Sequence, residues 1–167
     1  TRYIGDWSSD VCSSDLVYAG PIVPHRHGLL AMNAPTEALA SCLCGAVRLH
    51  AALPTKWVAH CHCTRCQRAH GAPLVTWAGF EAAQVAVDDA GGALRWHVAA
   101  EGGSRGFCGT CGSPMLFKSA RWPGELHVAR ALFTTPLDRA PQAHVFFDTH
   151  VPWLDCADEL PRHAAGD

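Results

Sequence analysis

Three cysteines fall within six residues in the stretch CHCTRC, residues 61–66. Two further clusters flank it along the chain, CLC at residues 42–44 and CGTC at residues 108–111. Closely spaced cysteines suit a metal because two thiolates can reach one ion at a bond length of about 2.3 Å. The seven cysteines make up four ligands for a closed structural site and three for a second site that keeps one position open. The sequence therefore predicts metal binding, and it determines the second site less fully than the first.

Other uses of the clustered cysteines stay open at this point. A neighbouring His60, His62 or His70 could close the second site and make it purely structural. Thiolates also suit Cu(I) and iron–sulfur clusters. Disulfides need an oxidising compartment, and a redox pair of thioredoxin type expects a βαβ context that the sequence lacks. Cys156 has no clustered partner and is expected to be an ordinary buried thiol.

Short segments of alternating apolar and polar residues predict a mainly β fold with little helix. The clearest are residues 94–98 and 126–128, and breakers such as Gly91 and Gly92 stand between such segments. A helix of one or two turns is expected over residues 64–70, ended by Gly71. Five large aromatic residues are expected to be core residues: Trp57, Trp77, Phe80, Trp96 and Phe117.

Composition limits the classes of partner. The chain has 167 residues, of which 49% are hydrophobic and 17% charged, so a globular protein is expected. A net charge of −2 and the lack of a basic stripe give no electrostatic case for nucleic acid. No run approaches the ~18 apolar residues of a membrane span. We expect small-molecule partners, no nucleic acid and no membrane, and the oligomeric state stays open.

The first 16 residues, TRYIGDWSSDVCSSDL, look unlike the rest of the chain. From residue 6 onward they resemble the conceptual translation of a sequencing-library adapter. We therefore expect residues 1–31 to be a non-native leader, Met32 to be the natural start, and residues 32–167 to form one domain. The metal-type use of cysteine and the lack of a signal-like apolar stretch predict a cytoplasmic protein.

From about residue 40 to residue 161 the chain resembles the glutathione-dependent formaldehyde-activating enzyme family, the CENP-V/GFA domain. The matching motifs occur in the order of the family: CLCGAVR at 42–48, CHCTRCQRAHGA at 61–72, WAGF at 77–80, RGFCGTCGS at 105–113 and VPW at 151–153. The combination is far more specific than a single C-x-x-C motif. Gln67 stands where arginine is common in the family, which removes a positive charge near the site.

This resemblance implies a β-tent fold, in which small antiparallel sheets surround a structural zinc site. It also assigns two zinc ions per chain. Four cysteines correspond to the ligands of the structural zinc: Cys42, Cys44, Cys108 and Cys111. Cys61, Cys63 and Cys66 correspond to the ligands of a second zinc, which the resemblance makes the catalytic one.

The activity that the resemblance implies is that of a carbon–sulfur lyase. Such an enzyme adds glutathione to formaldehyde, or a related thiol to a related aldehyde, and forms an S-hydroxymethyl adduct. Arg65, Arg68 and Arg105 lie beside the cysteine motifs and are candidates for binding the glutathione carboxylates. The alternative is a non-catalytic zinc-binding or glutathione-carrying domain, which would show the same cysteine pattern.

Overall fold

The computed structural model describes residues 35–100 and 102–165, which form ten strands and one short α-helix. The elements in chain order are β1 (Glu37–Ser41), β2 (Arg48–Ala52), β3 (Trp57–Cys61), α1 (Thr64–His70), β4 (Val75–Glu81), η1 (Ala82–Gln84), β5 (Val85–Asp88), β6 (Leu94–Val98), β7 (Gly103–Cys108), β8 (Pro114–Ser119), β9 (Glu125–Ala129), η2 (Arg130–Leu132), β10 (His144–Val145) and η3 (Phe147–Thr149). The mainly β prediction is confirmed. The predictions about residues 1–31 fall outside the described residues.

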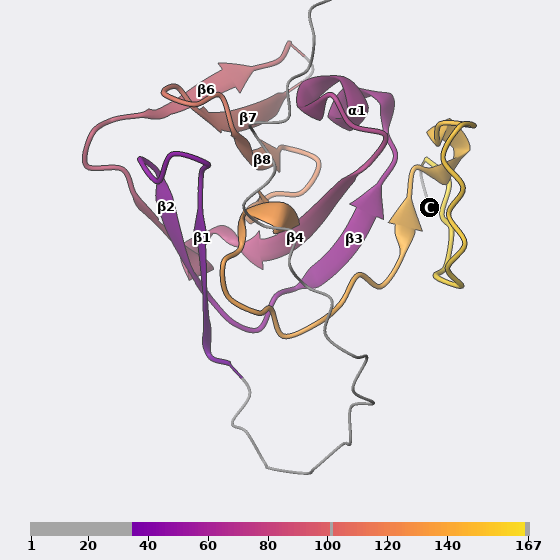
Figure 1. The fold of residues 1–167 in the computed structure, drawn as a ribbon, viewed down its shortest axis with the longest axis horizontal. Helices are drawn as coiled ribbons and strands as arrows, with labels where there is room; N and C mark the ends of the chain where they lie inside the picture. Colours follow the sequence, from indigo (N-terminus) through magenta and orange to yellow (C-terminus); the bar gives the residue numbers. More distant parts are fainter. Residues whose placement is uncertain (1–34, 101, 166–167) are drawn as a thin grey trace, which may run out of the picture. The chain divides into compact units, whose positions relative to one another are not determined.

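The strands form a three-stranded sheet, β1-β2-β5, and a seven-stranded sheet, β10-β3-β4-β9-β8-β7-β6. Neighbouring strands are antiparallel, except that β10 runs parallel to β3. This pairing sets His144 beside His60 and Val145 beside Cys61. In Figure 1 the orange-yellow strand β10 therefore lies beside β3, and its Val145 is next to Cys61, the first residue of the CHCTRC stretch.

Helix α1 begins and ends where the sequence predicts. Cys63 is its N-cap residue, and its sulfur accepts a hydrogen bond from the backbone N–H of Cys66. Gly71 follows the last residue with φ of 59°, a left-handed conformation that glycine adopts without steric cost. Among residues 35–100 and 102–165, no helix has the length and apolar character to cross a membrane.

Two apolar clusters pack on opposite sides of β4. Phe80 and Ala78 belong to the larger cluster, which joins the three-stranded sheet to the seven-stranded one. Trp77 belongs to the smaller cluster, which lies under α1 and includes Cys61 and Cys66. Successive strand residues point to opposite faces, so β4 contributes to both clusters at once. The larger cluster also contains Cys42 and Cys108, so two members of one cysteine group are part of the core.

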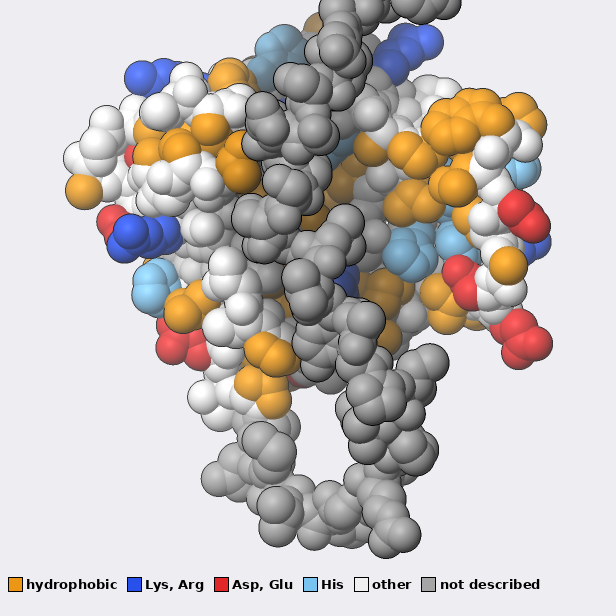
Figure 2. Space-filling model, viewed as in Figure 1, with side chains coloured by type: hydrophobic (Ala, Val, Ile, Leu, Met, Phe, Trp, Pro, Cys, Tyr) orange, Lys and Arg blue, Asp and Glu red, His pale blue; other side chains and the backbone are white. Residues whose placement is uncertain are grey.

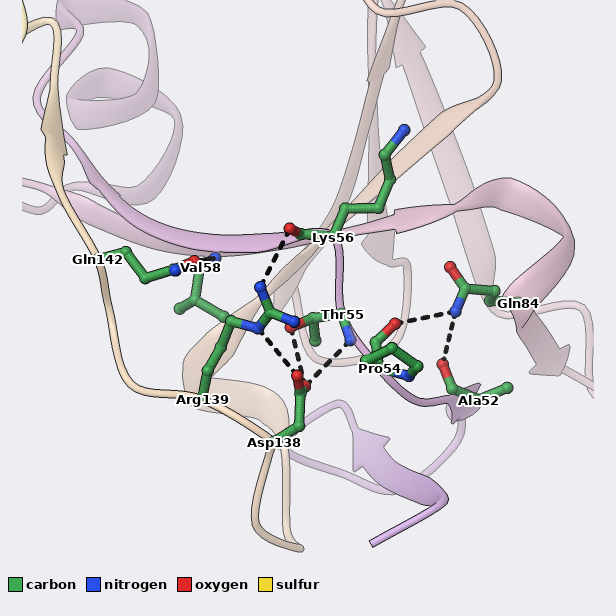
Figure 3. Close-up of polar contacts among 9 residues, drawn as sticks. All are labelled: Ala52, Pro54, Thr55, Lys56, Val58, Gln84, Asp138, Arg139 and Gln142. Carbon is green, nitrogen blue, oxygen red and sulfur yellow. Dashed lines mark hydrogen bonds and ion pairs between the residues drawn. The ribbon is translucent and has the colours of Figure 1, made fainter. Parts of the chain in front are cut away.

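A polar contact fastens the segment before β10 to the start of β3. Figure 3 shows the Asp138 carboxylate accepting hydrogen bonds from the backbone N–H and the hydroxyl of Thr55, at 3.0 and 2.8 Å. Arg139 pairs with the same carboxylate at 2.9 Å and donates to the carbonyl of Lys56. Thr55 is almost fully buried, so water cannot reach its backbone N–H and hydroxyl. The Asp138 carboxylate accepts from both donors in place of water.

The prediction of five core aromatic residues is only partly right. Trp77 and Phe80 are buried, at 3% and 0% exposure. Trp96 is exposed instead and packs under the ammonium group of Lys118, 4.6 Å from its nitrogen. Trp57 and Phe117 are half-buried and line a cavity. Alternation along a strand identifies two faces, but it does not say whether the second face meets protein, solvent or a cavity.

Candidate metal centres

Cys42, Cys44, Cys108 and Cys111 come together as the sequence predicts, with all four sulfurs within 4.8 Å of one another. The sulfur of Cys44 lies 3.6 Å from that of Cys42 and 3.8 Å from that of Cys108. Zinc–sulfur bonds of about 2.3 Å in tetrahedral geometry place sulfurs roughly 3.8 Å apart. The four side chains therefore fit a closed zinc site.

Local turns aim these sulfurs at one point. The backbone N–H of Val47 donates to the Cys42 sulfur at 3.3 Å, within the turn that leads from β1 into β2. The Ser113 hydroxyl lies 3.2 Å from the Cys111 sulfur, within the turn between β7 and β8. Since the two turns belong to different sheets, the cluster joins the three-stranded sheet to the seven-stranded one.

Ionisation of this cluster is uneven without a cation. Hydrogen bonds from the side chain and backbone of Ser113 lower the pKa of Cys111 to about 5. A backbone hydrogen bond from Ala46 lowers the pKa of Cys44, but contacts with the three other cysteine sulfurs, Cys111 foremost, and desolvation together outweigh it and raise that pKa to about 12. One thiolate thus suppresses the next, and a divalent cation is what allows all four to ionise together.

Cys61, Cys63 and Cys66 form the second predicted cluster, with their sulfurs within 4.8 Å of one another. Cys61 ends β3, Cys63 caps α1, and Cys66 lies on the buried side of that helix. The sulfurs of Cys61 and Cys66 are 3.8 Å apart, which also fits zinc. None of the histidines that sequence reasoning left open as a fourth ligand belongs to this group among the described residues.

The hydrogen bonds of Gln67 give a structural role to a residue that differs from the arginine common in the resembling family. Its side-chain amide donates to the carbonyl of His62 at 2.6 Å and to the carbonyl of Thr149 at 2.9 Å. Helix α1 is therefore tied both to the CHC stretch and to the 3₁₀ helix η3. The Gln67 side chain therefore holds the backbone around the cluster in place through two neutral hydrogen bonds.

Charge at the second cluster is concentrated on Cys66. Hydrogen bonds from Cys61 and Cys63 hold the pKa of Cys66 well below its ordinary value, and the positive charge of Arg105 lowers it further. Contacts with the sulfurs of Cys63 and Cys66, together with burial, raise the pKa of Cys61. The nitrogens of the Arg105 guanidinium lie 3.8 and 3.9 Å from the Cys66 sulfur. The cluster therefore carries thiolate character with a cation already beside it.

A cavity of about 820 Å³ opens next to the three-cysteine cluster and includes Cys61, Cys63 and Cys66 in its lining. Its walls include five large aromatic side chains and a buried histidine: Trp57, Trp77, Phe117, Trp122, Phe146 and His127. The four-cysteine cluster lies outside the described lining of this cavity. The two clusters thus differ in their surroundings. The four-cysteine cluster reaches the surface, where Cys44 is exposed to solvent, whereas the three-cysteine cluster faces a space that a small molecule can enter.

Two of the three arginines that the sequence analysis proposed as glutathione contacts line this cavity. Arg65 and Arg105 line it, whereas Arg68 is exposed on α1 and is not among the described lining residues. Arg121 also lines it and was missed by the sequence analysis. Arg121 lies far from any cysteine motif, in the turn between β8 and β9, and only the pairing of those strands brings it to the site.

Comparison with protein-family models matches residues 37–149 to the glutathione-dependent formaldehyde-activating enzyme family, GFA. The chain belongs to the GFA family. The match spans both cysteine clusters and all the strands of the GFA domain. A comparison with curated protein sequences found no match.

Among solved structures, the GFA domain is similar to a crystal structure of a Rhodobacter sphaeroides protein, with 23% sequence identity and a TM-score of 0.51. The alignment covers 59% of this chain and 89% of the other. At this identity the likeness supports the fold alone.

Cys156 departs from the sequence expectation of an ordinary buried thiol. It is half-buried, and its sulfur lies within 4.8 Å of a ring nitrogen of His62 and one of His144. The partners are 94 and 12 residues away, so local spacing in the sequence carried no signal for this group.

Proposed function

We propose that this GFA domain is a zinc-dependent carbon–sulfur lyase that adds glutathione, or a related thiol, to formaldehyde or a related aldehyde. The observation that carries the proposal is the contrast between the two clusters. Three cysteine sulfurs face the 820 Å³ cavity, whereas the four-cysteine cluster does not. Three protein ligands and one open position are typical of catalytic zinc, and four are typical of structural zinc.

The proposed metal assignment follows from this contrast. Cys42, Cys44, Cys108 and Cys111 would hold the structural zinc. Cys61, Cys63 and Cys66 would hold the second zinc, which gives two ions per chain from the cysteine clusters. When bound there, zinc would favour the thiolate form of an incoming thiol and leave it nucleophilic. A cytoplasmic location belongs to the proposal, because a reducing compartment keeps seven such thiols free.

The chain's own residues would orient the two reactants. Arg105 is held between the Cys66 sulfur and the ring of Phe117, whose centroid lies 4.8 Å from its guanidinium carbon. An arginine fixed in this way can pair with a carboxylate of glutathione while it stays beside the sulfur ligands. Arg65, which also lines the cavity, is the second candidate for such a contact.

The proposed reaction conserves all atoms and needs no redox partner. The sulfur of the thiol forms a bond to the aldehyde carbon, and the π electrons of the carbonyl move to oxygen. The proton released by the thiol ends on that oxygen and gives the S-hydroxymethyl product. Holding both reactants in one cavity removes much of the entropy cost of their encounter.

The test is exchange spectroscopy by NMR on glutathione and formaldehyde, with zinc-loaded protein and without it. We expect the protein to accelerate exchange between free glutathione and its adduct. Cys63→Ser should abolish the acceleration and lose one zinc while the structural zinc stays bound. Arg68→Ala, outside the described cavity lining, is the matched control and should behave as the parent protein.

The alternative class is a non-catalytic zinc-binding or glutathione-carrying domain. A carrier would bind glutathione, seen as a change in tryptophan fluorescence from the cavity wall, and would leave the exchange rate unchanged. No acceleration by a sample with both cysteine clusters filled would therefore reject the lyase and leave the carrier.

A further inference from the structure

A third group of ligand-type side chains includes His62, which lies between Cys61 and Cys63, but none of the clustered cysteines. His62, His144 and Cys156 each offer one ligand atom, and these atoms all lie within 4.8 Å of one another. Both histidines are 1% exposed, and Cys156 is half-buried. Figure 2 shows histidine side chains beside hydrophobic and acidic ones on the right of the drawn face, where Figure 1 places the C-terminal segment.

Asp158 fixes which ring nitrogen of His144 carries the proton. The Nε2 atom of His144 lies 2.9 and 3.1 Å from the two carboxylate oxygens of Asp158. A carboxylate only accepts, so Nε2 carries the proton and Nδ1 keeps a lone pair. A histidine that donates one ring N–H to a carboxylate and turns the other nitrogen inward is the usual arrangement of a metal ligand.

The lone pair of His144 points at His62. Its Nδ1 lies 2.7 Å from Nε2 of His62, so one proton is shared between the two rings. That leaves the other nitrogen of His62, Nδ1, which is buried and has no hydrogen-bond partner in the described part of the chain. A buried nitrogen without a partner is costly. The two nitrogens that face each other, Nε2 of His62 and Nδ1 of His144, are the ones that can reach a common ion.

We propose that His62, His144 and Cys156 form a third metal site, for zinc or a similar borderline transition ion. Two imidazoles and one thiolate are a donor set that such ions prefer over calcium or magnesium. The ion would take the place of the proton between the two rings and would bind Nε2 of His62, Nδ1 of His144 and the sulfur of Cys156. Asp158 would hold His144 in the ligating tautomer without contacting the ion.

The proposed site would fasten the C-terminal segment to β3. His62 directly follows β3, His144 belongs to β10, and Cys156 lies in the segment beyond η3. Besides the proposed ligands, that segment is held by backbone contacts, such as His144 N–H to the carbonyl of Pro161 at 2.8 Å, and by the Arg162 guanidinium over the ring of Phe147. An ion shared by three separated parts of the chain would lock them together. The site uses none of the clustered cysteines, although His62 lies between Cys61 and Cys63 in the chain.

The test counts zinc ions bound to the full chain by native mass spectrometry during a zinc titration. We expect the parent protein to bind one more ion than Cys156→Ser and one more than His144→Gln. The matched control is His163→Gln, whose side chain is exposed in the same segment and which should keep the parent count. An equal count in the parent protein and Cys156→Ser overturns the proposal, whatever the activity of the protein. Because Cys156 is half-buried, this variant keeps the test valid even if His144→Gln does not fold.

A second measurement locates the ion. Hydrogen exchange of backbone amides in residues 150–165 should slow when zinc is added to the parent protein and should not respond in Cys156→Ser. Cobalt added in place of zinc should give a thiolate-to-cobalt absorption that is larger in the parent protein than in Cys156→Ser. Identical cobalt spectra and identical exchange in the two proteins would contradict a site that uses this sulfur.

Discussion

The Arg105 guanidinium lies against the sulfur of Cys66, with its two terminal nitrogens 3.8 and 3.9 Å from that atom. Arg105 comes from β7 and Cys66 from α1, two elements that share no sheet pairing. The ring of Phe117, paired with Arg105 across β7 and β8, supports the guanidinium from the other side. A fixed positive charge therefore faces a buried thiolate at the edge of the cavity.

This contact predicts that Arg105 tunes the affinity of the second metal site. Arg105→Ala removes N–H groups that donate to a ligand sulfur, and losses of such outer contacts weaken metal binding by about 10- to 100-fold. We expect a loss of this size for the three-cysteine site and no change for the four-cysteine site, measured by competition with a chromophoric chelator. Arg68→Ala, exposed on α1, is the control. An unchanged affinity in Arg105→Ala would show that the guanidinium serves the substrate alone.

The four-cysteine cluster predicts a strong link between metal and stability. It joins turns of two different sheets, and structural zinc supplies folding free energy directly. Cys111→Ser, or removal of zinc by a chelator, should lower the free energy of unfolding by several kcal/mol, on the order of what a structural zinc contributes. Thermal unfolding followed by circular dichroism would measure the loss.

Thr110→Ala is the matched control for that experiment, because Thr110 is exposed in the same turn. Exposed substitutions away from special features change stability by about 0.5 kcal/mol or less. Equal melting temperatures for Cys111→Ser and Thr110→Ala would mean that the cluster does not hold a stabilising ion.

Gly79 predicts a steric effect on the cavity wall. It pairs with Trp57 across β3 and β4, and a Cβ atom at this position would lie 2.2 Å from the indole ring. Overpacking of this kind costs about 1–3 kcal/mol, and here it would also displace a tryptophan that lines the cavity. Gly79→Ala should lower stability and change tryptophan fluorescence. Gly91→Ala, where a Cβ meets nothing within 4 Å, should do neither.

The sequence predicted the cysteine groups well because metal geometry acts over short spacing. Two thiolates must reach one ion, so ligands such as Cys108 and Cys111 recur within one turn and can be recognised without a structure. The helix over residues 64–70 was also predictable, because Gly71 offers the left-handed conformation that ends it.

The residues that could not be predicted meet through long-range strand pairing. His62 and His144 are 82 residues apart and touch only because the two-residue strand β10 runs parallel to β3. Arg121 reaches the cavity through the turn between β8 and β9. The local alternation of residue types does not show which distant strands pair or in which register, so neither contact has a signature in the sequence.

The contact between Asp138 and Thr55 predicts a specific loss of stability in acid. Burial raises the pKa of Asp138, but hydrogen bonds from the Thr55 backbone, Arg139 and the Thr55 hydroxyl outweigh it and hold that pKa below its ordinary value of 3.8. A group whose pKa is lowered by folding stabilises the protein above its unfolded pKa, and this contribution is lost as the pH falls through the lower folded value.

Asp138→Asn should therefore cost about 1–3 kcal/mol at neutral pH, the usual cost of removing a charged partner from buried donors. The difference between the two proteins should shrink as the pH falls from about 4 toward 2, measured by urea unfolding. Asp155→Asn, at an exposed position, should show no such pH-dependent difference. A gap between Asp138→Asn and the parent protein that stays constant from pH 7 to acid would mean that the charge of Asp138 contributes nothing and that only the shape of its side chain matters.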